Sequence, residues 1–147
     1  TARIMGLDDP TKKMSKSASS PYNYIAITDD ADTIRNKIKR AVTDSGSEVK
    51  AGPDKPALTN LLTIFSEVTG KTAEEIEKEF AGKGYGEFKS SLAEAVVEYL
   101  KPIQIRYNEI IKDEKTLIDI LEKGSEKIAP LAQKTLKDVK EKVGLGL

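Results

Sequence analysis

Apolar residues recur at the spacing of an α-helix through most of this chain, and this periodicity constrains its fold more than any other feature. After residue 28 no stretch shows the two-residue alternation of a half-buried β-strand. With 147 residues, the chain is long enough for one core and a small appendage. We therefore predict an all-α fold, a helical bundle, with helices over about 29–42, 56–69, 72–80, 87–112, 114–123 and 125–143.

Glycine, proline and capping residues set the expected ends of these helices. Thr72 followed by Glu75 is typical of a capping box, and Gly70 is suited to end the helix before it. Gly124 is expected to end the fifth helix. Pro102 falls inside the fourth pattern and should kink it, while Pro130 either kinks the last helix or lies in its first turn.

The first 28 residues have a different pattern. Residues 2–7 resemble the apolar end of a short strand, and residues 8–24 are rich in Asp, Pro, Lys and Ser, as in a loop. That loop contains Lys13-Met14-Ser15-Lys16-Ser17. Two ammonium groups three residues apart, with hydroxyl and backbone N–H donors between them, are suited to surround a polyphosphate. A solvated lysine-rich turn is the alternative for such a pentapeptide taken alone.

Composition narrows the chemistry that the chain could perform. It has neither cysteine nor histidine, so a thiolate or imidazole nucleophile, base or metal ligand is excluded, and we predict no metal site. The 24 basic and 24 acidic residues cancel, which argues against attraction of nucleic acid by the whole surface. The polar first 20 residues show no signal peptide, and no apolar run is long enough to span a bilayer. We expect a piece of a cytoplasmic protein with no membrane partner.

The strings around the lysine loop resemble those of bacterial tryptophanyl-tRNA synthetases, which are class I aminoacyl-tRNA synthetases. The resemblance covers nearly the whole chain. One departure is visible, because Ala18-Ser19-Ser20 stands before Pro21 where the family often has an acidic or polar residue and then proline. The matching strings are Arg3-Ile4-Met5, Asp9 to Ser17, Ala41-Val42-Thr43-Asp44-Ser45, Gly82-Lys83-Gly84-Tyr85-Gly86, Pro102-Ile103-Gln104, Arg106-Tyr107 and Gly144-Leu145-Gly146.

This resemblance implies a mobile loop that closes over ATP. Lys13 and Lys16 would act in catalysis by contacting the ATP phosphates and the leaving pyrophosphate, with Mg²⁺ accompanying ATP in the parent enzyme. Met14 would lie against the adenine through its backbone and Ile4 would pack nearby, although an ordinary core residue is the alternative for Ile4. The implied ATP-binding residues are Ile4, Lys13, Met14, Ser15, Lys16 and Ser17, of which the two serines could simply shape the turn.

The same resemblance implies two domains. Residues 1–28 would end the nucleotide-binding domain with its ATP loop, and residues 29–147 would form the C-terminal helical domain, whose part from about residue 56 would receive the anticodon region of tRNA. The parent would join tryptophan to its tRNA through a tryptophanyl-adenylate and would be a homodimer, whereas a monomer is expected for this chain. The family's other nucleotide motif contains histidine, so the chain alone should be inactive.

Two alternatives remain open from the sequence. One is a fragment of the related tyrosyl-tRNA synthetase, and the other is a non-catalytic helical RNA or protein interaction module. The basic residues of the 30–42 helix could touch RNA or form a solvated face. The glycine run 82–86 lacks the spacing of a phosphate loop and is better explained as a hinge between helices.

Overall fold

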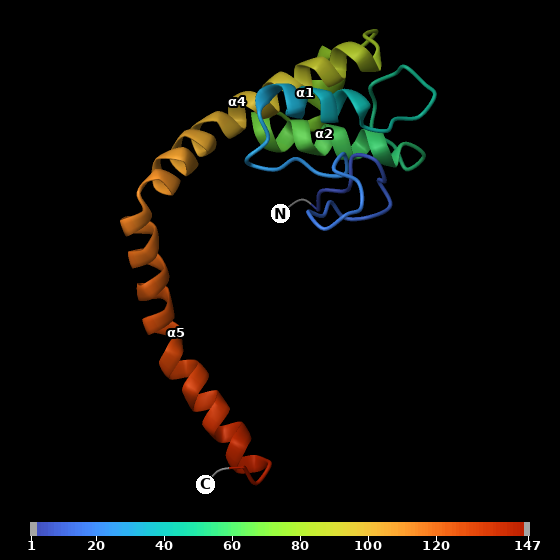
Figure 1. The fold of residues 1–147 in the computed structure, drawn as a ribbon. Helices are drawn as coiled ribbons and strands as arrows, with labels where there is room; N and C mark the ends of the chain where they lie inside the picture. The colour runs from blue at the N-terminus through green and yellow to red at the C-terminus, as the bar shows by residue number, and fades with distance from the viewer. Residues whose placement is uncertain (1–2, 146–147) are drawn as a thin grey trace. The chain divides into compact units, whose positions relative to one another are not determined.

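The computed structural model describes residues 3–145 and is built of helices, which confirms the all-α prediction (Figure 1). The chain divides into two compact units, the first ending at Gln104 and the second beginning at Ile105. The helices are α1 (Ala31–Arg40), α2 (Pro56–Thr69), α3 (Ala73–Glu79), α4 (Tyr85–Lys112) and α5 (Glu114–Lys142).

Most of the predicted helix ends are confirmed. The backbone of Gly70 adopts a left-handed conformation, with φ of 73°, and its N–H donates to Ser66 O at the end of α2. Thr72 and Glu75 form the predicted capping box, in which each side chain accepts a hydrogen bond from the backbone of the other. At the start of α1, Asp30 Oδ1 accepts a hydrogen bond of 2.7 Å from Thr33 N.

The prediction that Gly124 separates two helices is wrong, because α5 runs without a break from Glu114 to Lys142. A glycine inside a helix costs about 1 kcal/mol relative to alanine, but it ends the helix only where the backbone turns left-handed. The described glycines with positive φ are Gly70, Gly82 and Gly144. Pro130 consequently lies inside α5 and not in the first turn of a separate helix.

The strand predicted over residues 2–7 is present, in the described part of this segment, only as one antiparallel bridge between Met5 and Lys13. Ala2 lies outside the described residues, as does Gly146 of the C-terminal string. The bridge closes a hairpin-like turn over residues 6–12, and the lysine loop starts at its returning side, at Lys13.

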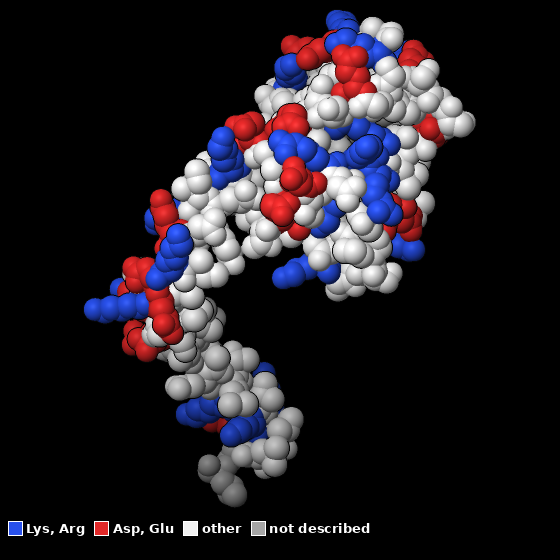
Figure 2. Space-filling view, turned by 45° about the horizontal axis from the view of Figure 1, so that its top comes forward, with Lys and Arg blue, Asp and Glu red and all other residues white. Residues whose placement is uncertain are grey.

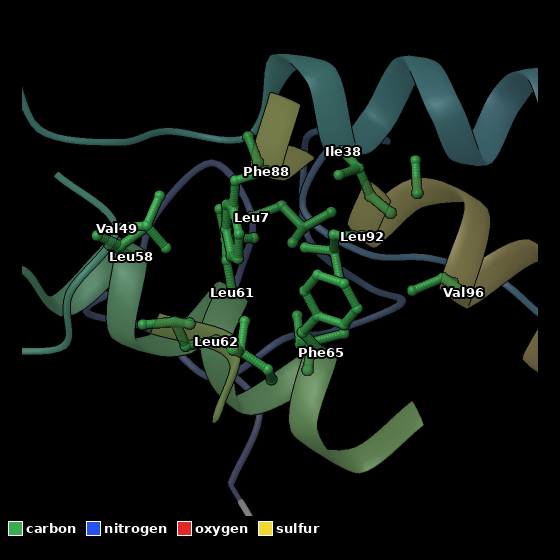
Figure 3. Packing of buried hydrophobic residues seen from close by; sticks show 14 of the residues in the cluster. Leu7, Ile38, Val49, Leu58, Leu61, Leu62, Phe65, Phe88, Leu92 and Val96 are labelled. Carbon is green, nitrogen blue, oxygen red and sulfur yellow. The ribbon is translucent and has the colours of Figure 1, made fainter. Parts of the chain in front are cut away.

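One apolar cluster joins this N-terminal segment to the helices of the first unit. Figure 3 shows Leu7 pointing in among residues of α2 and α4 such as Leu61 and Leu92, and Leu7 is only 2% exposed. Phe65, Phe80 and Phe88 pack against one another in tilted and edge-to-face arrangements, with ring centroids 5.5 to 5.8 Å apart. Burial of a leucine side chain is worth about 1.5–3 kcal/mol, so Leu7 fixes the start of the loop segment to the helices.

The second unit contains the last part of α4 and the whole of α5. None of the described side chains of α5 is buried within this chain. Across residues 3–145, no helix has an apolar stretch long enough to cross a membrane.

Candidate functional site

The lysine loop begins at a short antiparallel pairing between residues 4–6 and 12–14. Gly6 N donates to Lys12 O at 2.8 Å, and Met14 N donates to Ile4 O at 3.1 Å. This pairing brings Ile4 and Met14, two of the predicted site residues, side by side although ten positions separate them in sequence. Both are half-buried.

Ile4 and Met14 form one wall of an apolar cavity of about 400 Å³. Side chains of α2 and α4 complete it, and Glu67 is its one charged lining residue within the described chain. Tyr99, which is 50% exposed, also lines the cavity. Such a surface is suited to the flat face of an apolar ring. The other lining residues are Ile25, Ile64, Val68, Val96 and Leu100.

The two predicted catalytic lysines are exposed, Lys13 at the base of the hairpin beside the cavity wall and Lys16 three residues further along the chain. Lys13 is paired with Met5 only through its backbone, in the antiparallel bridge. Lys16 is also exposed, in the turn that follows Met14. An ammonium group on a flexible stem is a mobile point charge, so this pair is suited to follow an anionic group bound near the loop.

Lys12, in contrast, belongs to the turn that leads into the loop. Its Nζ lies 2.8 Å from Asp9 Oδ2, and Thr11 donates its backbone N–H and its hydroxyl to Asp9 Oδ1 at 3.0 and 2.5 Å. The hydrogen bond from Lys12, followed by those from Thr11, lowers the pKa of Asp9 to about 2. The Asp9 carboxylate therefore stays ionised and holds this turn together over the neutral pH range.

Ser15 and Ser17 form a small turn within the loop. Their hydroxyl oxygens lie 3.0 Å apart, and Ser17 N donates to Ser15 Oγ at 3.3 Å. Ser15 N in turn donates to Asn23 Oδ1 at 3.0 Å. The loop is thus attached to Asn23, a buried residue that the sequence analysis did not single out.

A second asparagine outside the sequence prediction, Asn60, attaches the cavity wall to α2. Asn60 Oδ1 accepts from Met5 N at 2.8 Å, and Asn60 Nδ2 donates to Met5 O at 2.9 Å. Its sequence signal is a polar residue two positions after Leu58 and directly before Leu61, in the otherwise apolar stripe of α2. Asn60 is 5% exposed, so its position on the buried face needed such a partner.

The segment that follows the loop is held by a buried ion pair. Lys37 Nζ of α1 lies 2.6 Å from Asp29 Oδ2, and their side chains are only 7% and 15% exposed. Asp29 Oδ2 also accepts from Ala26 N at 2.8 Å. From α4, Gln104 Nε2 donates to the backbone oxygens of Ile27 and Asp29, both at 2.8 Å. These contacts join the end of the loop segment to two helices.

Two of the family strings meet in the structure through one tyrosine. The Tyr85 hydroxyl lies 2.9 Å from each carboxylate oxygen of Asp44, and Gly46 N donates to Asp44 Oδ1 at 2.7 Å. Burial and the neighbouring Asp44 carboxylate raise the pKa of Tyr85. Nearby, Lys89 Nζ donates to Ala41 O at 2.7 Å, and burial lowers the pKa of Lys89. Residues 41–46 are thereby fixed against the start of α4.

The basic side chains of α1 are largely engaged within the protein. Arg35 forms a two-point ion pair with Glu94 at 2.7 and 2.9 Å and contacts Asp32 at 2.9 Å. Arg40 lies over the ring of Tyr22 at 3.9 Å. Blue and red atoms lie close together over much of the visible face in Figure 2. These contacts favour the solvated-face interpretation of α1 over an RNA-binding face.

The comparisons with known proteins agree with the motif strings. The model of the family described as tRNA synthetases class I (W and Y) matches residues 1–101. The chain is 53% identical over 144 residues to a tryptophan–tRNA ligase of Wolinella succinogenes, covering 98% of this chain and 44% of that protein. It is also 53% identical to the tryptophan–tRNA ligase of Halalkalibacterium halodurans, again covering 44% of the relative. The chain thus spans less than half the length of these relatives.

Solved structures show the same similarity in three dimensions. The chain superposes on tryptophanyl-tRNA synthetase from Mycoplasma pneumoniae with a TM-score of 0.76 and 30% identity, covering 98% of this chain and 44% of that one. The corresponding Campylobacter jejuni enzyme, solved with ADP and tryptophan, gives a TM-score of 0.70 at 30% identity, covering 99% of this chain and 44% of that one. Since the family model matches more than half of its residues, the chain belongs to the class I tRNA synthetases of the tryptophan and tyrosine group.

Proposed function

We propose that this chain is the C-terminal part of a tryptophan–tRNA ligase that activates tryptophan with ATP and transfers it to tRNA. The observation that carries the proposal is the pairing of Met14 with Ile4 at the apolar cavity, directly beside Lys13. It combines an apolar surface for a ring with adjacent cations for phosphates. The tryptophan–tRNA ligases that match nearly all of this chain support the same assignment.

In this proposal ATP binds with its adenine near Ile4 and Met14 and its phosphates near Lys13 and Lys16. Ser15 and Ser17 shape the turn between and after the two lysines and offer hydroxyl and backbone donors. Attack of the tryptophan carboxylate on the α-phosphorus releases pyrophosphate, and negative charge grows on this leaving group. Exposed ammonium groups can move with that charge. They therefore stabilise the transition state more strongly than they stabilise the ATP complex before reaction. Mg²⁺ would arrive with the ATP phosphates.

We assign residues 1–28 to the end of the nucleotide-binding domain and residues 29–147 to the helical domain that receives the anticodon region of tRNA. Binding to the RNA backbone releases counterions, so the affinity of the helical part for tRNA should fall steeply with salt. Filter binding of this chain to tRNA at about 50 and 200 mM salt tests the assignment. Affinity independent of salt, or no binding at low salt, would count against an RNA-binding domain.

Amino-acid specificity separates the proposal from its alternatives. The full-length protein should catalyse ATP–pyrophosphate exchange that depends on tryptophan and not on tyrosine. Exchange that depends on tyrosine would indicate the tyrosyl enzyme, and no exchange with either amino acid would favour a non-catalytic interaction module.

We also place the full-length protein in the cytoplasm, where its tRNA is used. We expect the full-length protein to be a homodimer and this chain to be a monomer. Sedimentation of both forms tests the oligomeric state.

A further inference from the structure

Asn23 connects the segment before the lysine loop, at Leu7 and Asp8, to Ser15 within the loop. Its side chain is buried, the residue being 5% exposed. Oδ1 accepts from Ser15 N at 3.0 Å, and Nδ2 donates to Asp8 Oδ1 at 2.6 Å. Its backbone oxygen also accepts from Leu7 N at 2.9 Å. One residue therefore ties the segment before the loop to Ser15, one of the two residues between the lysines.

The chemistry of this position suits an amide. The backbone N–H of Ser15 can only donate, and the ionised carboxylate of Asp8 can only accept, so a residue between them must offer one acceptor and one donor. The side chain of asparagine has both, at the length that the two distances require. Because Asn23 is buried, water does not readily replace a lost partner, and an unsatisfied group would displace the backbone.

We propose that Asn23 is a positioning residue that sets the backbone of Ser15 and thereby the reach of Lys13 and Lys16 toward the ATP phosphates. The proposal rests on the proposed function of this loop. A lysine side chain is flexible, so the place where its charge acts is set by the backbone that carries it. Stabilisation of a transition state needs charges placed in advance, and displacement of about 1 Å can cost about a hundredfold in rate.

The test exchanges the donor and the acceptor. Asn23→Asp keeps the acceptor for Ser15 but places two carboxylates against each other at position 8 and position 23. The double variant Asp8→Asn/Asn23→Asp restores a donor–acceptor pair in the opposite direction. Asn36→Asp, at an exposed position on α1, is the matched control for the same chemical change.

In the full-length enzyme, Asn23→Asp should lower kcat for tryptophan activation by about tenfold or more, while the tryptophan KM stays within about twofold. The double variant should recover to within about threefold of the parent, and Asn36→Asp should match the parent. In this 147-residue chain, hydrogen exchange of the Ser15 amide should be faster in Asn23→Asp and slower again in the double variant.

Two results would overturn the proposal. One is a parental kcat in Asn23→Asp, and the other is a loss that the double variant does not restore and that follows a fall in Tm, which would indicate a merely structural role. An unsubstituted enzyme that lacks tryptophan-dependent exchange would instead refute the proposed function. The two failures are therefore distinguishable, because only the second affects the parent protein.

Discussion

The side-chain amide of Asn60 on α2 holds the backbone of Met5 by two hydrogen bonds, one accepted from Met5 N at 2.8 Å and one donated to Met5 O at 2.9 Å. The side-chain amide thus accepts from one backbone N–H and donates to one backbone oxygen, as a residue of a neighbouring β-strand does. The helix thus supplies partners for Met5 N and Met5 O, whereas the pairing with residues 12–14 uses the backbone groups of Ile4 and Gly6. The same segment carries Ile4, whose backbone oxygen receives Met14 N.

Replacement of Asn60 should therefore destabilise the first unit. Asn60→Ala removes the partners of Met5 N and Met5 O and the two part-buried hydrogen bonds, and we expect the free energy of unfolding to fall by about 1–3 kcal/mol. Urea denaturation of this chain measures it. Asn36→Ala, at an exposed position on α1, should stay within about 0.5 kcal/mol of the parent. Equal effects of the two substitutions would show that the Met5 contact contributes nothing.

The buried ion pair between Lys37 and Asp29 leads to a second prediction. Lys37→Met leaves the Asp29 carboxylate, 15% exposed, without its nearest cation, so we expect a loss of about 3 kcal/mol in the free energy of unfolding. Lys39→Met makes the same change at an exposed position of α1 and should have little effect. Denaturation of both variants at neutral pH compares them, and a Lys37→Met loss no larger than that of Lys39→Met would contradict the structure.

Acid should loosen the turn that leads into the lysine loop. The pKa of Asp9 is lowered from 3.8 to about 2 by hydrogen bonds from Lys12 and Thr11. The stabilising contribution of a carboxylate with a lowered pKa is complete above its unfolded value and is lost as the pH falls toward its folded value. We expect this contribution to disappear between about pH 4 and pH 2. A carboxyl NMR titration of Asp9 with a midpoint near 3.8 would contradict this arrangement.

The 147-residue chain alone should not activate tryptophan. It spans 44% of the length of its tryptophan–tRNA ligase relatives and has no histidine for the family's other nucleotide motif. Tryptophan-dependent ATP–pyrophosphate exchange by the purified chain should therefore equal that of its Lys13→Ala/Lys16→Ala variant. Exchange clearly above this control would refute the prediction.

Helix positions were largely predictable from the sequence, because apolar spacing and caps act locally. Thr72, Glu75 and Gly70 each satisfy backbone groups within a few residues, so their roles follow from the order of residues. The prediction at Gly124 was wrong because this glycine keeps a helical backbone. The residues next to a glycine do not determine whether its backbone turns left-handed and ends the helix.

The candidate site was less accessible to sequence reasoning. Lys13 and Met14 stand in a recognisable string, whereas Asn23 and Asn60 act through partners that are distant in the chain. Asn60 meets Met5 across 55 positions, and such a contact depends on how the helices pack. A buried asparagine looks the same in sequence whether it holds a functional segment or only completes the core.

We propose that Lys13 and Lys16 stabilise the leaving pyrophosphate during tryptophan activation. The most direct test replaces each by alanine in the full-length enzyme, with Lys50→Ala, at an exposed loop position, as the control. Steady-state ATP–pyrophosphate exchange should show kcat reduced by about a hundredfold in each loop variant, with the tryptophan KM changed by less than about threefold. A kcat equal to that of Lys50→Ala would contradict the claim, as would a loss confined to the tryptophan KM.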